Sequence, residues 1–409
     1  MINKLYNNPS KIFLLSSIFI FILLLLPFYK VNNEFNLISY FFIFTCFLAA
    51  YLGLRIGFSH NKLNYIKTNI NSSKLIIVYK ICIIISIIGI ILTFYEFFVV
   101  RKISLELNFI YNKNKWLEGS PSFSSFIAAG FKSFSVFLIP FYFYIKEKNY
   151  NKNYSKNYLF ISIIISIFHI FFEVLLGSRA PILFSIMYVL ISYLYFKKKI
   201  SIFFIFISVV IFIYMSGLFF DYRLRAFDSN LFNSLYYSAY SFQVSPTENY
   251  SDNQNFDNFF FTSLYSIYFY FIHGFYEILY MIENSVIYYD FGKNLFWLPV
   301  KILNIFFNFN LNSSDIFRQG VYKTFIYTFF RDFKYFSPIV IFIIFFLFSY
   351  PFKYLAQGNT NWYFVTSVIF LYLLACPFFS PFSSGSISYL LLDSLVMRMF
   401  LFIITEKKH

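Results

Sequence analysis

Long apolar runs, separated by short polar segments, make up most of this chain. Each run is about 15 to 24 residues long, and about 20 apolar residues in an α-helix cross the hydrocarbon core of a membrane. The pattern therefore predicts an all-α polytopic membrane protein with 10 to 12 transmembrane helices. The predicted spans lie at about 12–29, 36–54, 75–99, 123–145, 158–176, 181–196, 201–220, 336–352, 362–378 and 386–404.

A stretch rich in Asn, Ser and Asp, residues 221–335, separates the first seven spans from the last three. It divides the chain into an N-terminal bundle at 1–220, a large loop region at 221–335 and a C-terminal bundle at 336–409. The loop region contains two further apolar pieces, about 261–283 and 291–309. Ten spans result if these pieces lie along the membrane surface, and twelve if they enter and return.

Both counts leave the two termini on the same side of the membrane. Aromatic residues favour the headgroup zone of a bilayer, so an aromatic-rich first piece favours ten spans with interfacial helices. These aromatic residues include Tyr265, Tyr268, Tyr270, Phe275 and Tyr276.

The composition excludes a soluble domain, a coiled coil and a disordered chain. Of the 409 residues, 59% are hydrophobic and only 12% are charged, whereas a soluble domain carries about 25% charged residues. Cys46, Cys82 and Cys376 all fall in apolar runs, so we expect them to be buried core residues without disulfides.

Basic residues orient the chain in the membrane. With the N-terminus in the cytoplasm, the cytoplasmic segments span about 60 residues and carry 16 of the 33 Lys and Arg residues. The positive-inside rule then places both termini in the cytoplasm and residues 221–335 outside. The net charge of +15 accordingly indicates contact with anionic lipid and no nucleic-acid binding.

Ionisable residues inside spans are costly and are functional candidates by default. Glu173 lies one helical turn after His169 on the fifth predicted span. Those near span ends, Lys80, Glu96 and Arg398, are expected to reach toward water. The full set is Lys80, Glu96, Lys132, Glu173, Asp393 and Arg398.

The connector Gly177-Ser178-Arg179-Ala180-Pro181 gives the sharpest local signal. Gly permits a reversal of the chain, and Pro fits the first turn of the next helix. Arg179 is then expected at the outer membrane boundary, where a guanidinium suits bidentate binding of phosphate. A simple interfacial anchor is the alternative, and Glu173 is a supporting residue in the functional interpretation.

Four further arginines lie in the predicted outside region: Arg223, Arg225, Arg318 and Arg331. Arg223 and Arg225 follow the seventh span at alternate positions, where they can flank the same lipid headgroup or serve as boundary anchors. Fixed guanidinium groups stabilise the charge that builds on a leaving pyrophosphate. We therefore expect a pyrophosphate-lipid site with a general base, for which His273, Glu277 and Asp332 are the candidates.

At these residues the chain resembles the O-antigen polymerases, the Wzy-type oligosaccharide repeat-unit polymerases. The matching features are Gly-Ser-Arg at 177–179 before an apolar span, and Arg223 and Arg225 at the start of a long outside region. The segment 321–333 is similar to the family's Thr-x-x-x-[Phe/Tyr]…Asp-Phe-Gly pattern, with Lys334 where Gly is usual. The resemblance in architecture covers essentially the whole chain.

The resemblance implies a glycosyltransferase at the periplasmic face of a bacterial inner membrane. Its donor is a growing glycan on undecaprenyl pyrophosphate, and its acceptor is one repeat unit on the same lipid. Arg179, with Arg223 and Arg225, becomes a pyrophosphate ligand, and analogy with the related O-antigen ligases makes His273 the base. No metal or other cofactor is implied, and the expected partners are these glycan lipids, membrane lipid and a chain-length regulator protein.

Two other function classes stay open. A lipid-linked oligosaccharide flippase would carry paired charges deep in several spans and show repeat symmetry. An O-antigen ligase or a membrane acyltransferase is the other alternative, and His169 on the fifth span fits the deep catalytic His that an acyltransferase needs.

Overall fold

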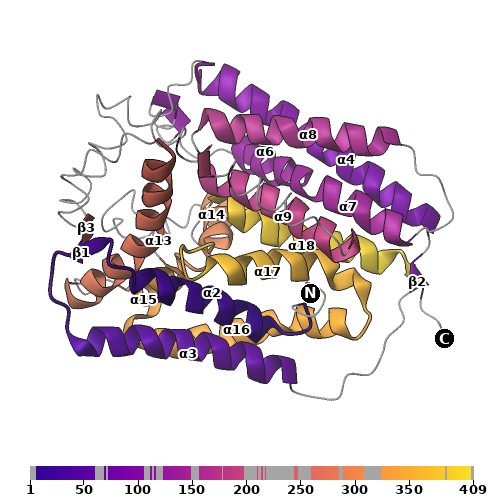
Figure 1. Cartoon of the computed structure of the whole chain (residues 1–409). Helices are drawn as coiled ribbons and strands as arrows, with labels where there is room; N and C mark the ends of the chain where they lie inside the picture. The colour runs from indigo at the N-terminus through magenta and orange to yellow at the C-terminus, as the bar shows by residue number, and fades with distance from the viewer. Residues whose placement is uncertain are drawn as a thin grey trace.

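The computed structural model is a bundle of roughly antiparallel helices (Figure 1). In the first half these are α2 (Pro9–Leu24), α3 (Leu37–Ser59), α4 (Ser72–Phe94) with the π-helical turn η1 (Tyr95–Val100), α6 (Phe123–Ser133), α7 (Ser135–Lys148), α8 (Lys156–Leu175) and α9 (Arg179–Lys197). The structure describes residues 6–59, 69–70, 72–105, 111–112, 115–116, 123–148, 156–176, 178–197, 210, 213–214, 217, 244–246, 259–284, 289–307, 324–382 and 385–406.

The second half continues the bundle and adds short helices at one end of it. Its elements are α13 (Phe259–Asn284), α14 (Trp297–Phe307), α15 (Phe325–Phe333), η3 (Lys334–Phe336), α16 (Ser337–Ala356), η4 (Thr360–Trp362), α17 (Tyr363–Ala375) and α18 (Gly385–Ile403). Two antiparallel strand pairs join distant segments: β1 (Tyr29–Val31) with β3 (Val244–Pro246), and β2 (Asn69–Ile70) with β4 (Thr405–Glu406).

The prediction of an all-α membrane protein is confirmed at the level of the helices. Five helical segments in the described part of the chain are long and apolar enough to cross a membrane: Leu37–Ser59, Ser73–Val100, Phe123–Lys148, Asn157–Leu175 and Phe325–Ala356, the last of which comprises α15, η3 and α16. Shorter apolar helices accompany them, among them Pro9–Leu24 and Ala180–Phe196. Of the predicted span 201–220 the structure describes only residues 210, 213–214 and 217.

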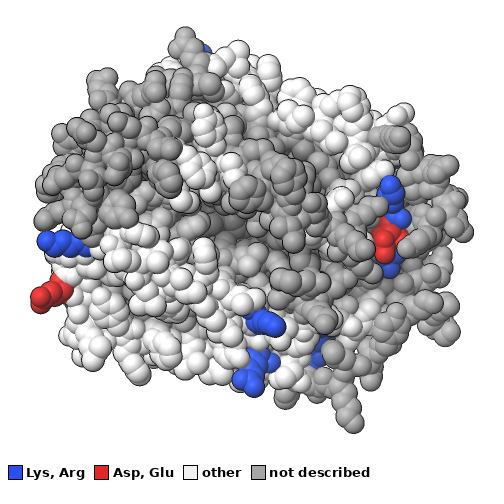
Figure 2. All heavy atoms as spheres, in the orientation of Figure 1, with Lys and Arg blue, Asp and Glu red and all other residues white. Residues whose placement is uncertain are grey.

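The outer surface of the bundle is apolar. Leu25, Leu37 and Ile38 expose 82%, 80% and 71% of their surface, as residues in contact with lipid tails would. On the face shown in Figure 2 most described residues are uncharged, and the few charged side chains form small groups. The three cysteines are free and buried, as expected.

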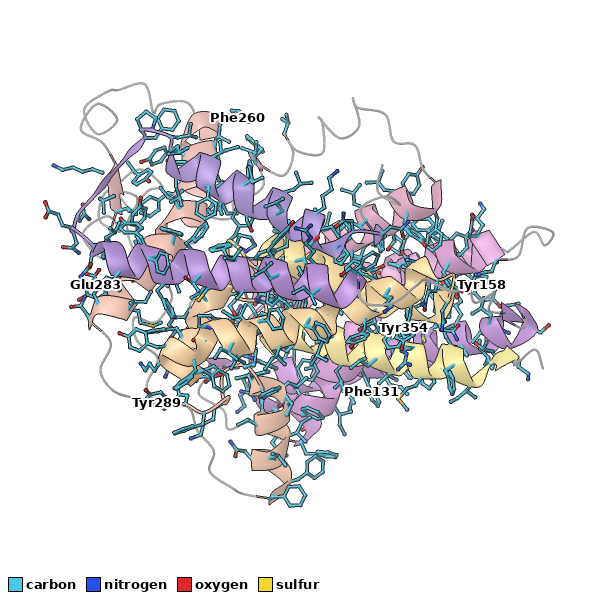
Figure 3. The ribbon with its side chains drawn as sticks, turned by 90° about the horizontal axis from the view of Figure 1, so that it is seen from below. Phe131, Tyr158, Phe260, Glu283, Tyr289 and Tyr354 are labelled. Atoms are coloured by element: carbon cyan, nitrogen blue, oxygen red, sulfur yellow. The ribbon has the colours of Figure 1, made fainter. Side chains whose placement is uncertain are left out.

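The two described ends of the chain lie at the same end of the bundle. The Tyr6 hydroxyl donates to Ser367 Oγ at 3.0 Å, and Asn361 Nδ2 donates to Thr405 Oγ1 at 2.8 Å. We call this end the terminal end, and the opposite end, which carries α13, β1 and β3, the loop end (Figure 1). Figure 3 shows the same division, with Phe260, Glu283 and Tyr289 at one end and Tyr158 and Tyr354 toward the other.

Close packing of α3 on α16 depends on two glycines, Gly53 and Gly57. A Cβ atom on Gly53 would lie 2.5 Å from the carbonyl oxygen of Phe342, and one on Gly57 would lie 2.7 Å from that of Phe346. Small residues at this spacing let two membrane helices approach closely enough for their backbones to pack.

Helix α13 packs across the loop ends of α2 and α3, steeply inclined to both (Figure 1). The Tyr268 hydroxyl donates to the carbonyl of Leu23, in the last turn of α2, at 3.1 Å. At its other end Glu283 Oε1 accepts from the backbone N–H of Asn36 at 2.6 Å. Tyr265, Tyr268, Phe275 and Tyr276 are buried within the protein, and their place in the headgroup zone stays a prediction.

Helix α15 begins inside the bundle and runs back alongside the first half of α16. The backbone N–H of Phe325 donates to the carbonyl of Cys376 at 3.1 Å, and its ring packs against Phe47 and Phe345. The chain reverses at Lys334, which has a φ of 48°. The sequence interpretation assigned residues 325–333 to the outside loop region, whereas here they form part of the core.

Candidate functional site

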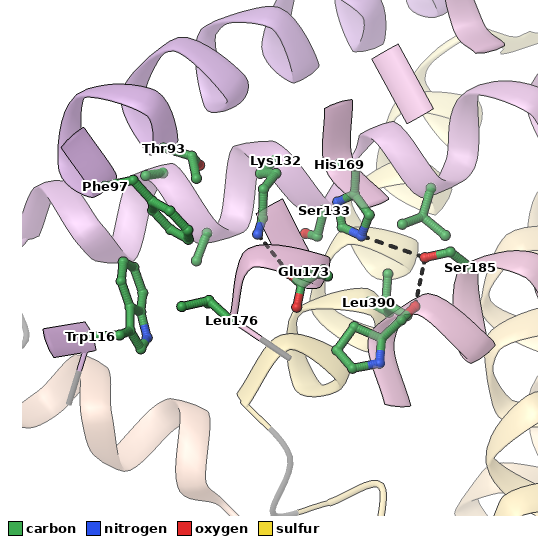
Figure 4. Close-up of a pocket in the computed structure, with 14 residues that line it drawn as sticks. Thr93, Phe97, Trp116, Lys132, Ser133, His169, Glu173, Leu176, Ser185 and Leu390 are labelled. Atoms are coloured by element: carbon green, nitrogen blue, oxygen red, sulfur yellow. Dashed lines mark hydrogen bonds and ion pairs between the residues drawn. The ribbon is translucent and has the colours of Figure 1, made fainter. Parts of the chain in front are cut away.

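A cavity of about 60 Å³ lies between α4, α6, α8, α9 and α18 (Figure 4). This is enough room for a few water molecules. One part of its wall is polar and another is aromatic and aliphatic. The polar residues are Thr93, Lys132, Ser133, His169, Glu173 and Ser185, and the apolar ones include Phe97, Trp116, Leu176, Pro181 and Leu390.

Lys132 enters the cavity because α4 and α6 approach closely at Gly89. A Cβ atom on Gly89 would lie 2.2 Å from the backbone nitrogen of Lys132, so only glycine permits this approach. Two serine hydroxyls then bond to the backbone at the end of α6: Ser133 Oγ to Gly130 and Ser135 Oγ to Lys132. Such bonds compete with the helical backbone pattern, and α6 ends here before α7 begins.

A buried ion pair joins α6 to α8. Lys132 Nζ lies 2.7 Å from Glu173 Oε1, and the two side chains expose only 9% and 1% of their surface. The second carboxylate oxygen, Glu173 Oε2, is also buried and has no hydrogen-bond partner among the described residues. A buried carboxylate oxygen of this kind is an acceptor site for a donor that enters the cavity.

His169 lies one turn before Glu173 on the same face of α8, as its spacing predicts. Its Nε2 atom lies 3.5 Å from Ser185 Oγ, which donates to the carbonyl of Pro181 at 2.8 Å. Within the described chain His169 Nδ1 has no hydrogen-bond partner. The cavity thus holds an imidazole and a carboxylate on adjacent turns.

A second acid reaches α6 from α18. Asp393, 3% exposed, accepts a hydrogen bond from Ser133 Oγ, the residue that follows Lys132. Neighbouring residues of α6 therefore bind acids from two different helices, Glu173 of α8 and Asp393 of α18. These ionisable residues stand out in the apolar runs of the sequence, but which of them pair follows only from the packing of the helices.

Another buried charge cluster lies beside the aromatic part of the wall. Glu96, on the π-helical turn η1, accepts from Ser125 Oγ at 2.8 Å and lies 3.7 Å from Arg101 Nε. The Arg101 guanidinium covers the ring of Trp116 at 4.4 Å, and Phe97 contacts the same ring. The expectation that Glu96 reaches toward water is wrong, because Ser125 and Arg101 compensate its charge inside the protein.

Leu176 and Pro181, on either side of the Gly-Ser-Arg triplet, both line the cavity. Helix α8 ends at Leu175, and the backbone N–H of Ser178 donates to the carbonyl of Glu173 at 2.8 Å. Helix α9 begins at Arg179 itself, and Pro181, in its first turn, lines the cavity. The backbone of Arg179 is described and its side chain is not.

The three predicted bases lie elsewhere. His273 and Glu277 are one turn apart on α13, with 1% and 3% exposure, and the His273 ring stacks on Phe269. Asp332 is fully buried, and both of its oxygens accept hydrogen bonds from the 294–295 backbone.

Arg331, a predicted pyrophosphate ligand, binds the same segment, residues 290–295, that Asp332 binds. Its Nε atom lies 2.6 Å from Asp290 Oδ2, and Nη1 donates to the Tyr327 hydroxyl at 2.9 Å. Arg331 and Asp332 thus attach the chain at 290–295 to α15. The other predicted ligands, Arg223, Arg225 and Arg318, lie outside the described residues.

No group of three or more His, Cys, Asp or Glu residues in the described part of the chain is arranged to hold a metal ion. Comparison with protein-family models, with curated proteins and with solved structures finds no match. The resemblance to O-antigen polymerases stays a prediction based on the residues quoted for it.

Proposed function

We propose that this protein polymerises undecaprenyl-pyrophosphate-linked oligosaccharide repeat units into O-antigen or a related surface polysaccharide. The observation that carries the proposal is the position of the Gly-Ser-Arg connector. Leu176 and Pro181, on either side of this triplet, line a cavity whose wall also carries a carboxylate, an ammonium and an imidazole. A site for a lipid diphosphate needs a cation at the membrane boundary, and a glycosyl transfer needs an acid or a base beside it.

Arg179 supports the donor end of this proposal. It is the first residue of α9, where open backbone N–H groups and the helix dipole favour an anion. Its guanidinium can bind two phosphate oxygens at once. In the proposal the loop end faces the periplasm, both termini face the cytoplasm, and α13 is an interfacial helix of a protein with ten spans in the bacterial inner membrane.

The reaction is a glycosyl transfer. The terminal sugar hydroxyl of the acceptor attacks the anomeric carbon of the donor glycan, and undecaprenyl pyrophosphate leaves with the bonding electron pair. The glycan therefore grows at its reducing end. Arg179 stabilises the negative charge that builds on the leaving diphosphate.

A deletion strain examined by a lipopolysaccharide gel tests the proposal. We expect the ladder of long chains to disappear while material with a single repeat is retained, and the full chain on a plasmid should restore the ladder. Retention of the ladder in the deletion strain would contradict the proposal.

A transporter, such as a lipid-linked oligosaccharide flippase, is a second candidate because one observation favours it. A lysine and two acids from α6, α8 and α18 lie inside the bundle. Lys132 pairs with Glu173, and Ser133 donates a hydrogen bond to Asp393. Proton-coupled transporters use such embedded acids. A flippase deletion would remove the single-repeat material as well as the ladder, so the same gel separates the two functions.

A further inference from the structure

We propose that Glu173 is the general base of the polymerase and that the cavity beside it receives the acceptor hydroxyl. This inference rests on the proposed function. It replaces the three candidate bases drawn from the sequence with one side chain of defined geometry. The cavity is accordingly the acceptor subsite, and its ligand is the hydroxyl-bearing edge of a sugar.

Open acceptor capacity distinguishes Glu173 from Asp332. Both oxygens of Asp332 are occupied by donors from the 294–295 turn, at 2.7 to 3.2 Å. Glu173, which lines the cavity, uses Oε1 for Lys132, whereas its buried Oε2 has no partner among the described residues. A base must lie within hydrogen-bond reach of the proton it removes, so an occupied carboxylate is a poor choice.

Lys132 fixes the orientation of this carboxylate. The contact of 2.7 Å holds Oε1 and leaves Oε2 as the carboxylate oxygen without a partner among the described residues (Figure 4). Gly89 in turn fixes the backbone of Lys132 against α4. A base held by a second side chain on a packed helix is positioned before the substrate arrives.

The position of Glu173 fits the proposed donor site. It lies two residues before the end of α8, about 3 Å along the helix axis from Leu175. Phe97 and Trp116 form an apolar side of the same cavity, with ring centroids 5.0 Å apart. Pockets that combine aromatic walls with a few polar groups are typical of small-molecule sites.

The size of the cavity limits what enters. A volume of about 60 Å³ accommodates a hydroxyl and the carbon that carries it, and not a whole sugar ring. The rest of the acceptor therefore lies outside the cavity.

The acceptor O–H proton passes to Glu173 Oε2 while the acceptor oxygen forms its bond to the anomeric carbon of the donor. The bond from that carbon to the diphosphate oxygen breaks, and its electron pair leaves with undecaprenyl pyrophosphate. Glu173 ends the step protonated and loses its proton to water afterwards.

The test uses the full chain in lipid vesicles with a synthetic polyprenyl-diphosphate-linked repeat unit. We expect Glu173→Ala to lower the initial rate of chain extension by about 10²–10⁴-fold, the usual contribution of a general base. Sodium formate, which supplies the missing carboxylate, should restore at least tenfold, whereas sodium chloride at the same ionic strength should not. A purely structural ion pair would not give rescue by formate.

Glu173→Gln serves as the second variant, because the amide oxygen can still accept a hydrogen bond from Lys132. With rates expressed per amount of folded protein in the vesicles, we expect it to be as slow as Glu173→Ala. Either variant extending chains within threefold of the wild-type rate, or a loss that formate leaves unchanged, would overturn the inference. Glu277→Gln is the rival variant, and its loss together with an active Glu173→Gln would move the base to α13.

Failure of the inference can be told from failure of the proposed function. If the wild-type protein extends chains and the Glu173 variants do so too, only the assignment of the base is wrong. If the wild-type protein does not extend the repeat unit, the proposed function itself is wrong.

Discussion

A charge inside a membrane bundle is stabilised only by the groups that neighbouring helices bring to it. Lys132 and Glu173 come from α6 and α8, and their contact depends on the approach of α4 at Gly89. Removing one partner of a buried pair leaves an uncompensated charge, which costs about 3–5 kcal/mol.

Lys132→Met should therefore destabilise the protein strongly, while Lys132→Met combined with Glu173→Met should recover much of the loss. Two apolar residues of similar volume leave no charge to compensate. Thermal unfolding of the purified protein in detergent measures both variants. A double variant less stable than Lys132→Met alone would show that the pair does not interact as described.

Substitution of Arg179 tests the donor site. We expect Arg179→Ala to abolish long-chain polysaccharide while the protein still reaches the membrane, and Arg179→Lys to restore it only in part, because an ammonium cannot bind two oxygens at once. Chain length on a lipopolysaccharide gel is the measurement. Lys80→Ala, at an exposed position on α4, is the matched control. Unchanged polymer length and amount in Arg179→Ala would remove this residue from the site.

At this scale the sequence identified the ionisable residues but not their partners. Lys132, Glu173 and Asp393 were recognisable because charges inside apolar runs are rare. Their pairing depends on which helices pack together, and an apolar run looks the same on every face. For the same reason the burial of Glu96 against Ser125 was not predictable.

The helices themselves followed from the sequence more closely than their contacts. Predicted spans such as 123–145 and 386–404 agree within a few residues with Phe123–Lys148 and Gly385–Ile403, because the length of an apolar run sets the length of a membrane helix. The inward position of α15 was missed, since its nine residues are too few for a span.

The contact of α3 with α16 gives a prediction at this scale. Gly53→Ala should lower the thermal stability of the protein, because the new Cβ would meet the Phe342 carbonyl oxygen at 2.5 Å and push the helices apart. Gly130→Ala is the matched control, since its Cβ would come no closer than 3.6 Å to Tyr389. Unfolding of both variants in detergent is the measurement, and equal melting temperatures would contradict the packing described.

The whole molecule has two distinct ends, and its described termini share one of them. An even number of apolar runs in the sequence predicted that the two termini would lie at the same end. The position of α13 across the loop end could not be predicted, because a helix that lies across a bundle and one that enters it can have the same composition.

Labelling from outside the cell tests the arrangement of the two ends. The three native cysteines are buried, so they should not react with a membrane-impermeant thiol reagent. We expect Asn284→Cys at the loop end to be labelled in intact spheroplasts and Ser59→Cys at the terminal end only after permeabilisation. Both positions are exposed in the structure. The reverse pattern would place the Gly-Ser-Arg connector at the cytoplasm.

The most direct measurement of the proposed activity uses purified protein in vesicles with a radiolabelled single repeat unit on undecaprenyl pyrophosphate. We expect a series of products that differ by one repeat, with release of free undecaprenyl pyrophosphate for each bond formed. A repeat unit that only changes leaflet, or that stays a single unit at every protein concentration, would contradict polymerisation by this chain.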